Sequence, residues 1–153
     1  MARALIAVAV VFAFLVPGGA SLAQEASPTP PTSAIVRIVP AQAQVSLLSP
    51  EFAADITVES VTELGAFEVL IRFDPEYLDY TCVDFGDFMA RTGRTAYCVL
   101  LSPQNSADGQ VRFGCGTFGL DTQAPSGGGL LARVRFRAVA EGETSIPLEA
   151  TLS

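Results

Sequence analysis

Residues 66–73 read Ala66-Phe67-Glu68-Val69-Leu70-Ile71-Arg72-Phe73. Every second side chain from Phe67 to Phe73 is large and apolar, and the positions between them include Glu68 and Arg72. Because a β-strand turns successive side chains to opposite sides, this pattern predicts a strand whose odd-numbered residues face a core. Asp74-Pro75 follows and predicts a turn, since proline has no N–H to donate to a neighbouring strand.

The same period of two recurs at 52–59 and at 131–139. In the second stretch it turns Val134, Phe136 and Ala138 inward and leaves three arginines in a row outside. This row would either bind an acidic partner or pair with outward side chains of a neighbouring strand, and we expect the second. The arginines are Arg133, Arg135 and Arg137, and the expected neighbours are Asp55, Thr57 and Glu59.

Weaker strand patterns fill the chain from residue 34 onward, and turn residues recur at intervals of roughly ten residues. No stretch has the pattern of a long amphipathic helix. The sequence therefore predicts an all-β sandwich or barrel, with a hairpin loop at 105–109 and a flexible loop at 124–129. The weaker strands are expected at 34–38, 45–48, 78–83, 95–101, 110–116 and 144–148.

Composition excludes several classes of function. The 153 residues are enough for one domain, and the absence of histidine excludes Ser–His and Cys–His nucleophiles and histidine-ligated zinc. The net charge of -7 argues against a nucleic-acid partner, which needs a clustered basic surface. The acidic residues suggest no catalytic pair in a cleft, so we expect no catalytic residues and no enzyme activity.

The first 23 residues have the pattern of a secretory signal peptide. Arg3 precedes an apolar run at 5–16, and Ser21-Leu22-Ala23 forms a cleavage site of small residues; an uncleaved anchor helix is the alternative. Residues 24–33 contain three prolines and predict an extended linker. We therefore expect a domain at 34–153 that is secreted and, once processed, has no membrane span.

Three cysteines leave one over if two of them pair, as extracellular cysteines usually do. A hairpin centred on Ala107 would place Cys98 almost opposite Cys115, within disulfide distance. Such a bond would contribute about 3 kcal/mol by restricting the unfolded chain. Cys82 would then be a small buried side chain or a thiol, although pairing of Cys82 with either other cysteine stays open. The spacings are not those of a metal site.

Three stretches together resemble the cohesin domain: 64–78, the Gly86-Asp87-Phe88 loop, and 128–136. The resemblance covers about 34–153 and implies a nine-stranded β-sandwich of jelly-roll topology. Cohesins occur in secreted or cell-surface scaffolds and bind the dockerin domains of enzymes that degrade polysaccharides. The resemblance also implies one more strand after Leu152, beside the first strand. The sequence ends at Ser153, which predicts either a longer chain or an unpaired sheet edge.

The resemblance places candidate partner-binding residues on the outward side of the 66–73 strand: Glu68, Leu70 and Arg72. Many cohesins carry Asn-x-Asp on this strand, whereas here Ala66 replaces the asparagine and Glu68 keeps an acid. The alternative is that these residues form an ordinary solvated sheet face. Leu70 favours contact with a partner, because it is a branched apolar side chain on the outer side of a strand.

The resemblance therefore implies a secreted, non-catalytic module that binds a dockerin-type or other extracellular protein. Carbohydrate binding is the alternative, restricted to soluble glycans because the chain has no tryptophan and only three tyrosines to stack on sugars. No cofactor is expected. Asp79, Asp84 and Asp87 are interpreted as turn and cap residues, with ligation of calcium as the alternative.

Overall fold

The computed structural model describes residues 33–101, 106–119 and 122–153. The predicted signal peptide, and the predicted linker except for Ser33, lie outside the described residues, so both stay predictions. Among the described residues the helices are single 3-10 turns, η1 (Phe88–Ala90) and η2 (Ser106–Asp108). None of the helices in this part of the chain has the length and apolar character needed to cross a membrane.

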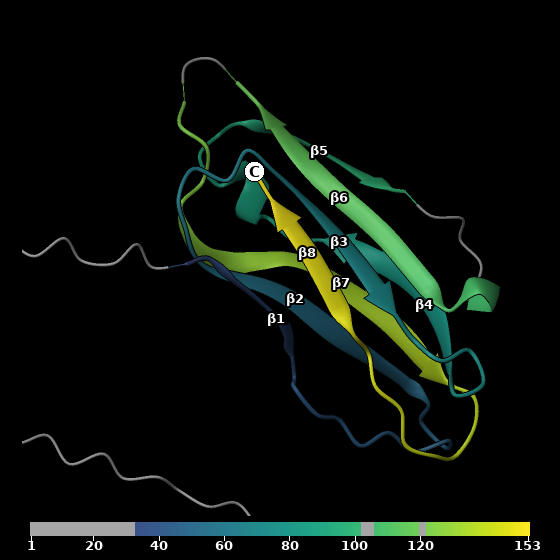
Figure 1. The fold of residues 1–153 in the computed structure, drawn as a ribbon. Helices are drawn as coiled ribbons and strands as arrows, with labels where there is room; N and C mark the ends of the chain where they lie inside the picture. Colours follow the sequence, from purple (N-terminus) through teal and green to yellow (C-terminus); the bar gives the residue numbers. More distant parts are fainter. Residues whose placement is uncertain (1–32, 102–105, 120–121) are drawn as a thin grey trace, which may run out of the picture. The chain divides into compact units, whose positions relative to one another are not determined.

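The described chain folds into two antiparallel four-stranded sheets (Figure 1). We call them the β1 sheet, with order β1-β2-β7-β4, and the β5 sheet, with order β5-β6-β3-β8. The predicted all-β sandwich of two antiparallel sheets is therefore confirmed. The strands are β1 (Ile35–Val39), β2 (Glu51–Val61), β3 (Ala66–Arg72), β4 (Leu78–Phe85), β5 (Thr95–Leu100), β6 (Gln110–Phe118), β7 (Gly127–Ala138) and β8 (Leu148–Leu152).

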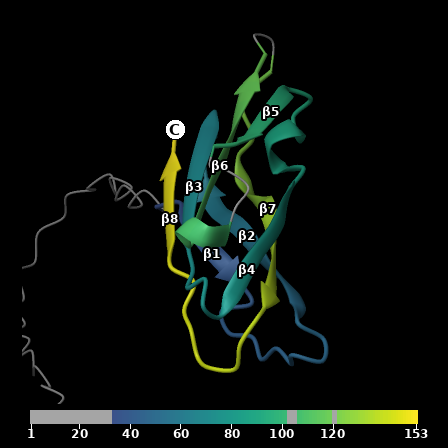
Figure 2. The ribbon, with the colours of Figure 1, turned by 90° about the vertical axis from the view of Figure 1, so that its right-hand side faces the viewer.

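The two sheets enclose one apolar layer between them, and Figure 2 shows them from the side. The predicted inward residues of β3 and β7 face this layer: Val69, Ile71, Val134 and Phe136 are fully enclosed, and Ala138 is half-buried against it. Phe136 packs against the rings of Phe52, Phe73 and Tyr80. The period of two in the sequence therefore records which side of each strand meets the core.

Two predicted strands are wrong. Residues 45–48 form only an isolated bridge between Ser46 and Ser49, and Leu48 is 98% exposed. The last strand is β8 at Leu148–Leu152 and not 144–148, because it begins after Pro147, whose carbonyl accepts a hydrogen bond from the Arg72 N–H. Pro147 has no N–H to donate to a neighbouring strand, which fits the later start of β8, whereas the 45–48 segment is an exposed loop.

The predicted flexible loop at 124–129 is also wrong in part, since β7 begins at Gly127. A Cβ atom on Gly128 would lie 2.9 Å from the Val58 carbonyl oxygen, and one on Gly129 would lie 2.7 Å from the Phe88 ring. These glycines therefore allow β7 to approach β2 and η1 closely.

The turn after β3 forms as predicted. The Asp74 carbonyl accepts hydrogen bonds from the N–H groups of Tyr77 and Leu78, and its carboxylate accepts one from the Glu76 N–H at 2.9 Å.

The first and last strands, β1 and β8, are edge strands of different sheets. In the described part of the chain β1 pairs with β2 alone.

Candidate functional site

The outer face of the β1 sheet is covered by ion pairs. Two hydrogen bonds join Arg133 to Asp55, Nε to Oδ1 at 2.6 Å and Nη2 to Oδ2 at 2.8 Å. Arg135 donates to Asp84 at 3.0 Å, and Arg137 donates to Asp79 at 2.9 Å. Each arginine of the row therefore has a carboxylate partner within the domain, which favours the cross-strand ladder over an acid-binding surface.

The predicted partners of the row are right only for Asp55. Glu59 pairs instead with Arg37 on β1, at 3.4 Å. The reason is strand direction: β2 and β7 are antiparallel, so Arg135 and Arg137 lie opposite Ala53 and Glu51, progressively farther from Thr57 and Glu59. The adjacent strand β4 supplies the carboxylates for these two arginines.

Hydrogen bonds from Arg133 hold the pKa of Asp55 below its ordinary value of 3.8. The carboxylate is therefore ionised throughout the neutral range, and the pair acts as a fixed part of the solvated surface.

The outer face of the β5 sheet carries the candidate residues Glu68, Leu70 and Arg72. They alternate with the buried side of β3, so all three point away from the core. Glu68 pairs with Arg112 of β6 at 2.9 Å, and Arg72 donates to Glu149 of β8. The charges of this face thus neutralise one another, and half-buried Leu70 lies opposite Arg112 in the register.

Sequence reasoning missed the largest apolar side chains of the same face. Tyr97 is 65% exposed, Phe118 63% and Leu101 49%. Tyr97 and Val99 alternate with the inward residues of β5, and Phe118 ends β6. We call the exposed and half-buried apolar residues on the outer side of this sheet the apolar face: Ala66, Leu70, Tyr97, Val99, Leu101 and Phe118.

Glycines form the centre of the apolar face. Gly116 lies between Ala66 and Tyr97 in the register, and Gly114 lies between Glu68 and Val99. No side chain of β6 therefore separates β3 from β5 at these two levels, and Tyr97 borders bare backbone. A signal for this was present in the sequence: if Cys98 points inward, its neighbours Tyr97 and Val99 must point outward.

A single arginine fixes the end of this face near Phe118. The Arg94 guanidinium donates to the Thr117 hydroxyl at 3.0 Å and to the carbonyls of Gly119 and Thr122 at 2.8 and 2.6 Å. Thr117 in turn donates to the Gly65 carbonyl at 3.2 Å. The residue before β5, the end of β6 and the entry to β3 are thereby joined.

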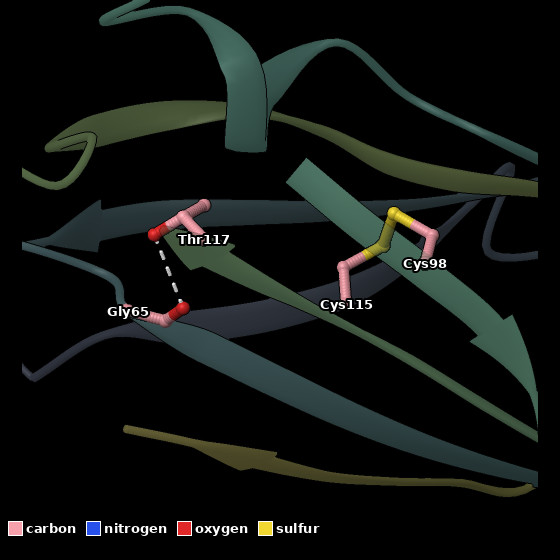
Figure 3. Close-up of a disulfide and its surroundings, with 4 residues drawn as sticks. All are labelled: Gly65, Cys98, Cys115 and Thr117. Carbon is pink, nitrogen blue, oxygen red and sulfur yellow. Dashed lines mark hydrogen bonds between the residues drawn. A yellow bond between two sulfur atoms is a disulfide. The ribbon is translucent and has the colours of Figure 1, made fainter. Parts of the chain in front are cut away.

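The predicted disulfide joins Cys98 of β5 to Cys115 of β6 on the inner side of the sheet (Figure 3). The two residues are direct partners in the strand register, as the hairpin reasoning expected. Cys82 is outside the disulfide, half-buried on β4 opposite Arg135.

The three aspartates considered for calcium are not brought together. Asp79 and Asp84 lie on β4 and face arginines, so their interpretation as turn or cap residues is wrong. Asp87 occupies the cap position of η1 without a side-chain hydrogen bond. Within the described ranges no group of three metal-ligating side chains forms.

A groove lies outside the apolar face, beside the segments that follow β1 and β7. It is an open groove of about 1130 Å³ between the 40–47 segment and the 140–147 segment. Its polar lining includes the amides Gln42 and Gln44 and the carboxylates Glu141 and Glu143. Amide, hydroxyl and carboxylate groups of this kind can bind the hydroxyls of a sugar.

No protein-family model and no curated protein matches the chain. Solved structures do match. The sixth cohesin of scaffoldin B from Acetivibrio cellulolyticus, in complex with a mutant Cel5 dockerin, is similar with a TM-score of 0.57 and 16% identity, over 79% of this chain and 86% of that one. A type II cohesin domain from the cellulosome of the same organism gives 0.55 and 20%, over 78% and 75%.

A non-cellulosomal cohesin from the archaeon Archaeoglobus fulgidus is similar with a TM-score of 0.50 and 15% identity, over 67% of each chain. The described part of this chain therefore has the cohesin fold, in agreement with the resemblance of its sequence.

Proposed function

We propose that this protein is an exported, non-catalytic module that binds a dockerin-type protein through the apolar face of its β5 sheet. The observation that carries the proposal is the exposure of Tyr97, Phe118 and Leu101 on one side of a cohesin fold. Clustered exposed apolar side chains usually mark a site of association, and aromatic side chains dominate the energetics of protein interfaces.

Charge distribution supports the choice of this face. On the β1 sheet the outward side chains include arginines and carboxylates that pair with each other, and such a surface is well solvated. The β5 sheet instead offers apolar side chains beside glycine backbone, with its charges paired along β3. A partner with a mainly apolar contact surface would therefore find fewer charged groups to desolvate here than on the β1 sheet.

The disulfide and the predicted signal peptide support export, because disulfides persist in oxidising compartments. We place the module in a polysaccharide-degrading or cell-surface assembly. An extracellular partner that is not a dockerin could use the same apolar face, and the test below distinguishes it from a dockerin.

The test is capture of a panel of dockerin domains by the full chain. Tyr97→Asp, Leu70→Asp and Glu68→Arg are each expected to weaken capture, with Tyr97→Asp losing about 30-fold as a central contact would. Leu48→Asp is the matched control, because Leu48 is an exposed apolar residue on the segment before β2 and outside the apolar face. Unchanged capture by all three variants would remove this face from the proposal. Repeating the capture without calcium measures whether the ion is required.

Binding of soluble glycans is the second candidate, favoured by the polar groove between the 40–47 and 140–147 segments. A glycan array measures it directly, and Gln44→Ala should then abolish the signal while Tyr97→Asp leaves it. Release of sugars from polysaccharide by the purified protein would overturn the non-catalytic assignment.

A further inference from the structure

Strand β5 carries Tyr97 and Val99 but is weakly held by the core. It is an edge strand that pairs with β6 alone. Its inward side chains are Ala96, Cys98 and Leu100, which are only partly buried. None of the buried core residues in the described chain comes from β5, whereas its neighbour β6 contributes Val111 and Phe113. Apolar packing alone thus gives β5 little resistance to local opening.

The disulfide supplies the missing anchor. It joins Cys98, in the middle of β5, to Cys115, which is 5% exposed and part of the core (Figure 3). Strand β6 is an interior strand with partners on both sides. The bond therefore ties a weakly packed edge to one of the best-held strands of the sheet.

Cys98 stands directly between the two apolar contact residues of β5. When its side chain is tied inward, the alternation of the strand requires Tyr97 and Val99 to point outward. Arg94 secures the same strand at its beginning through Thr117. Beyond Arg94 the strand is held beside β6 by its backbone pairing, which places Tyr97 opposite Gly116, and by the disulfide, which is the one covalent restraint on β5 in the described chain.

We propose that the Cys98–Cys115 disulfide is a positioning element of the partner-binding face, so that its reduction weakens partner binding. This rests on the proposed function. In the reaction a dithiol passes two electrons and two protons to the bond, is itself oxidised to a disulfide, and leaves Cys98 and Cys115 as thiols. Strand β5 then opens locally, and a partner must order it again on binding.

Hydrogen–deuterium exchange of the full chain, oxidised and after treatment with dithiothreitol, tests the local effect. Exchange in peptides covering residues 95–100 should quicken on reduction, while peptides from β7 stay unchanged. Equal exchange in both forms, or the same acceleration in every strand, would overturn the proposal, since the bond would then act on overall stability alone.

Affinity for a captured dockerin domain tests the consequence. Reduction should lower it about tenfold, the size of effect expected when a contact residue loses its fixed position. The C98S/C115S double variant should bind like the reduced protein, and its affinity should not change on addition of dithiothreitol. The affinity of Cys82→Ser should fall on reduction as that of the unaltered chain does. Val134→Ala, in the core of the β1 sheet, controls for stability: it should lower the melting temperature and leave affinity unchanged.

Equal affinity of the oxidised and reduced protein would overturn the positioning role. If no dockerin binds even the oxidised protein, the proposed function fails, and the exchange at residues 95–100 alone then decides whether the bond holds β5.

Discussion

Thr117 is the one buried polar residue of the core in the described chain. Its hydroxyl donates to the Gly65 carbonyl at 3.2 Å and accepts from Arg94 Nε at 3.0 Å (Figure 3 shows the first of these). A single hydroxyl thus satisfies a carbonyl at the entry to β3 and a guanidinium beside β5, which explains why a polar group is tolerated there.

Replacing this hydroxyl by a methyl group should cost two side-chain hydrogen bonds. Thr117→Val keeps the shape of the side chain, and the Gly65 carbonyl still accepts a hydrogen bond from the Thr117 N–H at 2.8 Å, as Arg94 still donates to backbone carbonyls. We expect the free energy of unfolding to fall by about 0.5–1.5 kcal/mol, the net contribution of a typical hydrogen bond. Urea denaturation measures it, with exposed Thr151→Val on β8 as the control. Equal stability of the two variants would contradict the network.

The ion pair of Asp55 with Arg133 makes a pH-dependent contribution. Because Arg133 lowers the pKa of Asp55 in the folded state, the pair stabilises the fold above the unfolded pKa, near 3.8. That stability is lost as the pH falls through the lower, folded pKa. Asp55→Asn should therefore be slightly destabilising at pH 7 and equal to the unaltered chain in strong acid. Denaturation at a series of pH values measures the difference, and a constant difference would contradict this.

At the scale of strands, local pattern predicted most of the fold. The period of two identified β2, β3 and β7 and their buried sides, because burial between two sheets imposes alternation along each strand. The strand predicted at 45–48 was wrong because its apolar residues are exposed in a loop, and hydrophobicity alone does not reveal this. The start of β7 was predicted too late because its glycines were interpreted as loop residues. They are instead needed where β7 approaches β2 and η1 closely.

The candidate site was predictable only in part. Glu68, Leu70 and Arg72 lie on one strand, so alternation sufficed to place them outward. Tyr97 and Phe118 join them only because β5, β6 and β3 are neighbours in the sheet, and strand order is set by packing between distant segments. The same reason explains why the predicted partners of Arg135 and Arg137 were wrong. Their observed partners lie on β4, which is a neighbour of β7 only in the folded sheet.

The two glycines of β6 on the apolar face should respond differently to alanine. At Gly114 a Cβ would lie 2.6 Å from the Phe67 carbonyl oxygen, so Gly114→Ala must push β3 and β6 apart, at about 1–3 kcal/mol. At Gly116 the nearest atoms would be the Phe118 ring and Ala66 Cβ, at 3.9 and 4.0 Å. Gly116→Ala should therefore be neutral or stabilising by up to about 1 kcal/mol. Thermal denaturation compares them, and similar melting temperatures would contradict this geometry.

For the molecule as a whole, the two sheets divide two requirements between them. The β1 sheet covers its outer face with paired charges, which favours solubility. The β5 sheet keeps an outer face of exposed aromatic and aliphatic side chains. Soluble monomers rarely expose clustered apolar side chains, so this face favours a role in binding a partner. The ion-paired sheet is thus the supporting layer, and the apolar sheet is the layer expected to meet a partner.

This division predicts that the arginine row has no part in partner binding. Arg135→Ala removes a guanidinium whose contact is Asp84, at 3.0 Å on the β1 sheet. The pair is exposed, so its loss should change the free energy of unfolding by less than about 1 kcal/mol. Dockerin affinity should change less than about twofold, as for a residue outside the interface, whereas Tyr97→Asp loses most binding. Calorimetric titration of both variants distinguishes the faces: a large loss for Arg135→Ala with an intact Tyr97→Asp would place the partner on the β1 sheet.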